Sequence, residues 1–273
     1  MTQPISLLIC ALGGEGGGLL SEWLMNTARL AGYPAQSTSI PGVAQRTGAT
    51  TYYIEVLPTP LSDLSRPPVF SLNPVPGALD ALLSSELLET ARQISAGLVS
   101  PDRTKVFSST ARSLTTLERM PLGDGRLDST ALVNLVEQWS LESQLWDFGA
   151  MAQTQGTMVS AVMLGVVAGS GLLPFAREHY EATLQHSGAH SAASLRGFSA
   201  AFTRVQTDQA LQAMLNDDDT AAPTVAMPDA VKALPEAVQA MAALGHARLR
   251  DYQSPAYAEL YLQRLRKVIA ADD

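Results

Sequence analysis

Two short loops hold the residues of this sequence whose types and spacing could do chemistry. The first, Gly13-Gly14-Glu15-Gly16, follows the apolar run Ile5–Leu12 and precedes an amphipathic segment that ends near Ala31. Glycines let the backbone turn tightly and leave free amides at a helix N-terminus, where the dipole favours an anion or a carbonyl group. The second loop is Gln45-Arg46-Thr47-Gly48, and its arginine offers a planar cation to an anionic group. We predict that both loops make binding contacts, and we predict no proton-transfer residue in either.

A strand, a glycine turn and a helix in this order are typical of the first βα unit of a doubly wound domain. NAD binding would also need an acidic residue at the end of the second strand, to hold the ribose hydroxyls. The predicted strand Ala35–Ile40 contains no acid, and no Lys-Ser or Lys-Thr pair follows the turn as in a Walker-type phosphate loop. The turn therefore suits another anion or a protein partner better than NAD. Two plainer interpretations stay open, namely glycines that serve packing alone and a solvated loop arginine.

The elements that must position these loops are predicted from apolar runs bounded by glycine and proline. After the first unit, the sequence predicts strands at 35–40, 51–57, 81–84 and 104–108 and a helix at 86–96. Further helices are predicted at 129–138, 157–169, 175–185 and 190–202. This order predicts a Rossmann-like α/β domain with a doubly wound mixed sheet, in which strand 51–57 is antiparallel. The long polar segment 109–128 is expected to be functional or to lie against a partner.

Composition excludes several function classes. The 273 residues carry a net charge of −8 and no Lys/Arg cluster, so we do not expect nucleic-acid binding. The single cysteine, Cys10, excludes a disulfide framework and any iron–sulfur cluster or cysteine-ligated zinc site held by this chain alone. No carboxylate or cysteine stands at metal-ligand spacing from the histidines His179, His186 and His190, so we predict no metal site. The N-terminus lacks a signal peptide and the apolar stretch 158–175 is short for a membrane span, which predicts a cytoplasmic protein without a membrane anchor.

The last 70 residues differ from the rest of the chain in their sequence pattern. The acidic run Asn216–Thr220 is predicted as a solvated loop, and Pro228 and Pro235 as residues that open helices. Apolar stripes at helical spacing between residues 234 and 268 predict a pair of helices. We therefore divide the chain into a catalytic-type domain at 1–203 and a helical C-terminal tail for subunit docking at 204–273.

The two loops together resemble those of a known family. The glycine turn and the run Gly42-Val43-Ala44-Gln45-Arg46-Thr47-Gly48 are similar to the gamma-type catalytic domain of 2-oxoacid:ferredoxin oxidoreductases. Further similar segments follow in order: Asp80, Ser85-Glu86-Leu87-Leu88-Glu89, Pro101-Asp102-Arg103-Thr104, Val162-Met163-Leu164-Gly165 and Ala193-Ser194-Leu195-Arg196-Gly197-Phe198. Gly123-Asp124-Gly125-Arg126 and the tail 251–265 resemble beta subunits of indolepyruvate oxidoreductases.

The resemblance implies oxidative decarboxylation of a 2-oxoacid, indolepyruvate or another aryl-pyruvate, on thiamine diphosphate. It implies transfer of the acyl group to coenzyme A and of electrons through 4Fe-4S clusters to ferredoxin or a similar acceptor. One cysteine cannot hold these clusters, and Gly123-Asp124-Gly125 lacks the asparagine that completes a thiamine diphosphate and magnesium motif. The resemblance therefore implies a large partner subunit that carries thiamine diphosphate, Mg and the clusters.

Two residues depart from the family pattern. The family has glycine at the position of Ala11 and glutamine at the position of Glu15. A carboxylate beside the glycine amides disfavours a phosphate there and suits a neutral or cationic group. Two other functions therefore stay open: a stand-alone Rossmann-type nucleotide-binding protein and a non-catalytic assembly subunit.

Overall fold

The computed structural model describes residues 3–40, 50–120, 125–188, 190–220 and 228–271. The chain divides into two compact units, Met1–Gln209 and Ala210–Asp273. The predicted boundary at 203/204 lies close to this division, while the roles given to the two parts stay predictions.

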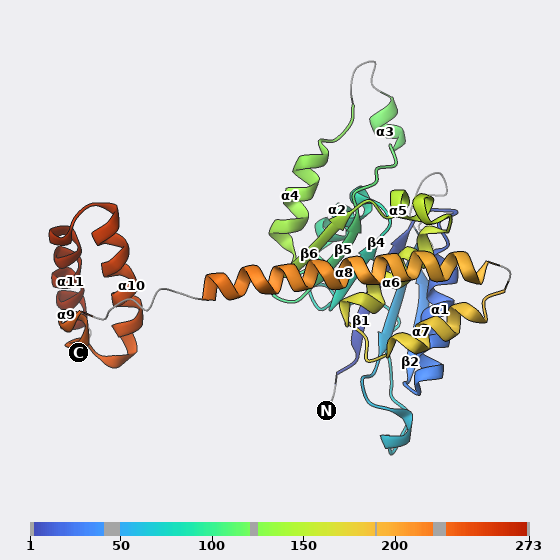
Figure 1. Cartoon of the computed structure of the whole chain (residues 1–273), viewed down its shortest axis with the longest axis horizontal. Helices are drawn as coiled ribbons and strands as arrows, with labels where there is room; N and C mark the ends of the chain where they lie inside the picture. The colour runs from blue at the N-terminus through green and yellow to red at the C-terminus, as the bar shows by residue number, and fades with distance from the viewer. Residues whose placement is uncertain (1–2, 41–49, 121–124, 189, 221–227, 272–273) are drawn as a thin grey trace. The chain divides into compact units, whose positions relative to one another are not determined.

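Unit 1 is built on a six-stranded mixed sheet of order β2-β3-β1-β4-β5-β6 (Figure 1). The strands are β1 (Ile5–Ala11), β2 (Ala35–Ile40), β3 (Thr50–Val56), β4 (Ala81–Ser84), β5 (Lys105–Ser109) and β6 (Glu142–Trp146). β3 runs antiparallel to both of its neighbours, and β1, β4, β5 and β6 pair in parallel. The predicted mixed sheet with one antiparallel strand at 51–57 is confirmed.

Helices cover both faces of this sheet, as the alternation of side chains along β1 requires. Leu7 and Ile9 pack with α1 (Gly17–Ala31), α5 (Phe148–Gln155), α6 (Val159–Ser170) and α7 (Arg177–Gln185). Leu8 and Cys10 point to the other face and pack with α2 (Leu87–Ser95) and α4 (Ser129–Trp139). The short elements η1 (Leu61–Asp63) and α3 (Thr116–Arg119) lie in the long connections.

The buried helix α6 packs closely against α8 (Ser191–Thr220). A Cβ atom on Gly165 would lie 2.3 Å from the carbonyl oxygen of Phe198, and one on Gly169 would lie 2.9 Å from that of Phe202. Only glycine permits such an approach of helix backbones, so these two positions set the spacing of the pair.

Two regions differ from the prediction. Strand β6 and helix α5 were not predicted, because the strand is short and polar and pairs only with β5. The predicted acidic loop Asn216–Thr220 is wrong, since its backbone forms the last turns of α8. Among the described residues no single helix is long and apolar enough to cross a bilayer; α5 and α6 reach that length only together, across a bend of 112°.

Within unit 2, α9 (Asp229–Lys232), α10 (Glu236–Tyr252) and α11 (Pro255–Ile269) form a small helical hairpin. Its core includes Val231, Leu234 and Leu262. Ser254 caps α11 by accepting a hydrogen bond from the backbone N–H of Tyr257, and Pro255 occupies the first turn. The predicted helix pair is therefore present, and Met241 and Tyr252 remain largely exposed on it.

Candidate functional site

The carboxyl ends of the parallel strands meet at one edge of the sheet, where ligand sites of doubly wound domains lie. From β1 the chain continues through α1 toward β2, and from β4 it continues through α2 toward β5. These two connections leave in opposite directions, which makes the space between the ends of β1 and β4 the topological switch point of the sheet. The predicted glycine turn lies on one side of this point and Ser85 lies on the other.

The glycine turn has the geometry expected of it, and part of that geometry serves packing. Gly14 and Gly16 adopt φ angles of 90° and 79°, which side chains disfavour. Gly16 is also the N-cap of α1, and a Cβ there would lie 2.8 Å from Oγ of Ser160 on α6. A Cβ on Gly17 would lie 2.7 Å from the Tyr52 ring of β3. Gly13, in contrast, is exposed and has no atom within 4 Å of its Cβ position.

Glu15 turns its carboxylate back toward the switch point. Oε2 accepts a hydrogen bond of 3.0 Å from the backbone N–H of Leu12 and a very close one from the hydroxyl of Ser85. The Ser85 hydroxyl also lies 3.2 Å from the same N–H, so the three groups join the turn after β1 to the end of β4. A negative charge therefore stands where a bound phosphate would otherwise approach the turn.

A buried hydroxyl lies under the same turn. Ser160 is fully buried in the first turn of α6, and its Oγ has no hydrogen-bond partner among the residues that the structure describes. Met158, the N-cap of α6, makes no side-chain capping bond. Within the described residues the Ser160 hydroxyl is therefore an unused donor and acceptor in the packing beneath the turn, where a group bound outside the turn does not reach it.

The second predicted loop, Gln45, Arg46, Thr47 and Gly48, lies outside the described residues. In the chain it connects β2 to β3, the strand whose Tyr52 ring packs against the start of α1 at Gly17. The assignment of this loop stays a prediction.

Sequence reasoning missed an ion-pair network at the same edge. The Arg112 guanidinium lies between two buried carboxylates: its Nε is 3.3 Å from Oε1 of Glu86, and its Nη2 makes a very close contact with Glu118. Arg112 Nη1 also donates to the carbonyl oxygen of Leu127 at 3.2 Å. The Arg112–Glu86 ion pair links the long polar segment after β5 to the start of α2, while the contacts with Glu118 and Leu127 lie within that segment. The three charged residues share no spacing pattern, so no sequence signal marks them.

Each acid of the network also holds backbone amides. Glu86 caps α2 by accepting from the N–H of Glu89 at 2.8 Å, and it accepts from the N–H of Ser113 at 3.1 Å. Glu118 accepts from the N–H groups of Thr115 and Leu127. The bond from the Thr115 amide is the largest cause that lowers the pKa of Glu118 to about 2. The network therefore orders the segment at neutral pH, and we identify no proton donor in it.

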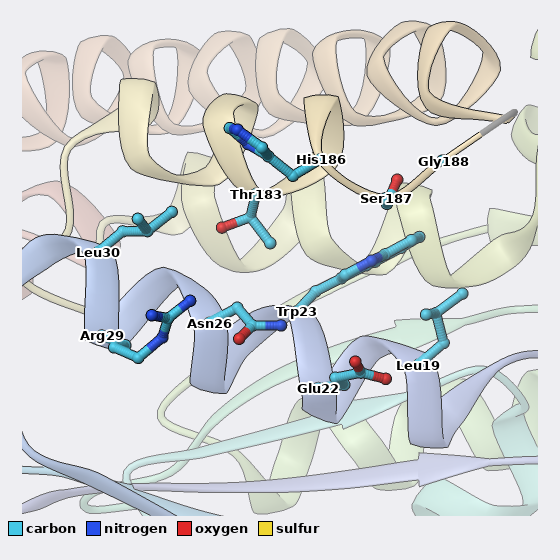
Figure 2. A pocket seen from close by; sticks show the side chains of 10 residues that line it. All are labelled: Leu19, Glu22, Trp23, Asn26, Arg29, Leu30, Thr183, His186, Ser187 and Gly188. Atoms are coloured by element: carbon cyan, nitrogen blue, oxygen red, sulfur yellow. The ribbon is translucent and has the colours of Figure 1, made fainter.

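A separate groove of about 560 Å³ lies between α1 and the end of α7 (Figure 2). It is lined by Leu19, Glu22, Trp23, Asn26, Arg29, Leu30, Thr183, His186, Ser187 and Gly188. None of these residues belongs to the two predicted loops. The groove has the size of small-molecule sites and a mixed apolar and charged lining, and no sequence signal marked it.

Metal ligands do not gather in the described part of the chain: no group of three or more His, Cys, Asp or Glu side chains could hold an ion there. Cys10 is fully buried in β1, and burial raises the pKa of its thiol above the usual range. A buried, protonated thiol in the middle of a sheet is a packing residue.

Comparisons with known proteins give a family match and several similar folds. The family model for pyruvate ferredoxin/flavodoxin oxidoreductase matches residues 6–204. No curated protein matches the sequence. The gamma subunit of a keto/oxoacid ferredoxin oxidoreductase from Geobacter sulfurreducens PCA is 18% identical with a TM-score of 0.50, over 75% of this chain and 97% of that one. Pyruvate oxidoreductase subunit PORC from Thermotoga maritima is 16% identical with a TM-score of 0.50, over 74% of this chain and 96% of that one.

A third similar structure is much longer than this chain. The 2-oxoglutarate:ferredoxin oxidoreductase from Magnetococcus marinus, solved with 2-oxoglutarate, coenzyme A and succinyl-CoA, is 11% identical with a TM-score of 0.52. The match covers 76% of this chain and 32% of that one. In all three structures the likeness extends over about three quarters of the chain.

Proposed function

Because the chain belongs to the pyruvate ferredoxin/flavodoxin oxidoreductase family, we propose that it is the cluster-free subunit of a 2-oxoacid oxidoreductase that uses thiamine diphosphate. The proposed reaction is the oxidative decarboxylation of indolepyruvate or another aryl-pyruvate to its acyl-coenzyme A, with two electrons passed to ferredoxin or a similar acceptor. The observation that carries this proposal is the family match over residues 6–204, which coincides with nearly all of unit 1. The aryl-pyruvate substrate rests on the resemblance of segment 123–126 and of the tail to indolepyruvate oxidoreductase beta subunits.

The residues of this chain do not fit the cofactors of such an enzyme. A 4Fe-4S cluster needs several cysteine thiolates, and Cys10 is the only cysteine and is fully buried. The described residues also offer no acidic cluster for magnesium. We therefore assign thiamine diphosphate, Mg and the clusters to a larger partner subunit, which would also deliver the electrons.

The proposed role of this chain is to complete the wall of the active site. The turn Gly13-Gly14-Glu15-Gly16 and the loop Gln45-Arg46-Thr47-Gly48 are the surfaces that we propose for it. Since the Glu15 carboxylate turns back toward the switch point, we place the phosphates of coenzyme A away from the glycine turn. A neutral group of the substrate or a polar group of the partner suits the turn better.

The test is to recover the tagged chain from its native extract and to examine what accompanies it. We expect a larger polypeptide with a broad iron–sulfur absorbance, and reduction of a viologen dye that depends on indolepyruvate or phenylpyruvate. Pyruvate and 2-oxoglutarate are the control substrates. Recovery of a colourless chain alone would contradict the proposal, and activity restricted to the control substrates would contradict its aryl-pyruvate part.

A non-catalytic assembly role is the second candidate, and one observation favours it. The Glu15 carboxylate already accepts hydrogen bonds from the Leu12 N–H and the Ser85 hydroxyl, so these donors are engaged within the chain. The turnover of the partner purified without this chain distinguishes the two functions. If this chain serves assembly alone, the partner keeps its turnover once it is folded. A stand-alone nucleotide-binding protein is less favoured, since no acid stands on β2; an NAD titration of the isolated chain tests it.

A further inference from the structure

The connection between β3 and β4 presents several apolar side chains to solvent. Between residues 67 and 77 three apolar side chains are strongly exposed: Val69 at 93%, Leu72 at 62% and Val75 at 56%. Large exposed apolar patches rimmed by polar residues mark interaction sites, and these three side chains lie within seven residues of one segment. We call residues 67–77 the proline ledge. Figure 1 shows the connection, in light blue to cyan, extending beyond the amino ends of the parallel strands.

The proline ledge is fixed to the body of the unit at two points. The backbone N–H of Ser71 donates to Oε2 of the buried Glu55 at 2.7 Å, and the carbonyl oxygen of Ser71 accepts from Gln36 at 3.2 Å. The N–H of Gly77 donates to the carbonyl oxygen of Gly97 after α2 at 2.9 Å. The exposed side chains therefore stand on an anchored backbone.

The Glu55 carboxylate is also hydrogen-bonded through its second oxygen, the one that does not accept from Ser71. Its Oε1 accepts a hydrogen bond of 2.6 Å from the hydroxyl of Tyr53, which is also buried. Burying a carboxylate is costly unless its oxygens are hydrogen-bonded, and here Tyr53 and the Ser71 amide each donate to one oxygen of Glu55. The conformation of the ledge is thus set by β3.

The composition of the ledge indicates its partner. Residues 67–79 contain no charged side chain, in a chain of net charge −8. Pro67, Pro68, Pro74 and Pro76 restrict φ, so little backbone entropy is lost when the segment is covered. A preordered, uncharged, proline-rich segment fits an apolar groove lined by aromatic side chains.

We propose that the ledge docks into an uncharged, apolar groove on the larger subunit of the same enzyme, an inference that rests on the proposed function. In the Magnetococcus marinus protein the matching fold makes up 32% of a longer chain, where covalent continuity keeps it beside the other domains. A separate chain needs a persistent interface in its place, and persistent interfaces are the more apolar class.

The test compares tagged chains in their capacity to recover the cluster-bearing subunit from native extract. Val69→Lys/Leu72→Lys adds two charges to the exposed ledge, and Val75→Lys is an independent second variant. Ser62→Lys/Ser65→Lys adds the same two charges to the same connection outside the ledge. Circular dichroism melting confirms the fold of each chain, and light scattering gives the mass of each chain alone.

We expect the Val69/Leu72 and Val75 variants to recover about tenfold less cluster-bearing subunit, or lower still, while the Ser62/Ser65 variant recovers as much as the unmodified chain. Equal recovery of the cluster-bearing subunit by every chain would overturn the docking role of the ledge and leave the proposed function standing. Failure of the unmodified chain to recover any cluster-bearing protein would overturn both. A chain that is dimeric alone and becomes monomeric through Val69→Lys/Leu72→Lys would instead identify a second copy as the occupant.

Discussion

Substitution of Glu15 separates the structural role of the carboxylate from the effect of its charge. Glu15→Ala removes the acceptor of two hydrogen bonds, and the N–H of Leu12 keeps an alternative acceptor in Ser85 at 3.2 Å. The net loss is therefore one charge-assisted bond, partly replaced by water, which amounts to about 1–2 kcal/mol of unfolding free energy. For a domain of this size each kcal/mol lowers the melting temperature by about 2–4 °C. Glu15→Gln keeps the acceptor and should cost less than about 1 kcal/mol.

The charge itself should control anion affinity at the turn. A carboxylate 4 Å from a bound phosphate opposes it by about 1 kcal/mol in water and about 4 kcal/mol near a protein surface. Glu15→Gln should therefore raise the affinity of the chain for coenzyme A or ADP at least about fivefold, and added salt should reduce the gain. Urea unfolding followed by circular dichroism measures the first effect, and calorimetric titration at two salt concentrations measures the second.

Two results would refute this reasoning. An alanine variant as stable as the unmodified chain would show that the bonds of Glu15 do not hold the turn to β4. A glutamine variant whose affinity for phosphate-bearing ligands stays unchanged would show that the charge of Glu15 does not keep phosphates away from the turn. Ser85→Ala is the matched control, since it removes the hydroxyl partner while the carboxylate and its charge remain.

Three further predictions concern the edge of the sheet and the packing beneath it. Arg112→Met leaves the buried Glu86 and Glu118 without their cation and should lower the unfolding free energy by about 3–5 kcal/mol, whereas Arg112→Lys should lose less; urea unfolding compares them. Because the pKa of Glu118 is lowered to about 2 in the folded chain, its contribution to stability is present above its unfolded pKa and is lost as pH falls from about 5 to 2. The unfolding free energy should therefore fall less steeply over this pH range in Glu118→Gln than in the unmodified chain. Equal pH dependence of the two chains would contradict the assignment. Gly165→Ala places a Cβ 2.3 Å from the Phe198 carbonyl oxygen and should cost about 2 kcal/mol or more, so a melting temperature equal to that of the unmodified chain would contradict the close helix contact.

Local pattern was sufficient for the core of the domain. The apolar run, glycine turn and amphipathic helix at 5–31 predicted β1 and α1, because hydrophobic periodicity and glycine placement act over a few residues. The antiparallel β3 was predicted in the same way and is confirmed. β6 was missed because it is short and polar and its stability comes from pairing with β5, a contact that no local signal records.

The sequence by itself determined what this chain cannot do, because composition does not depend on folding. One cysteine excludes a cluster site, and a second strand without an acid disfavours NAD. Only the tertiary structure decided how the charged residues are used. It turns Glu15 back onto Leu12 and Ser85, and it brings Arg112 between two acids that lie 26 residues before it and six after it. Such contacts join residues far apart in the chain or depend on one side-chain rotamer, and neither is written in residue spacing.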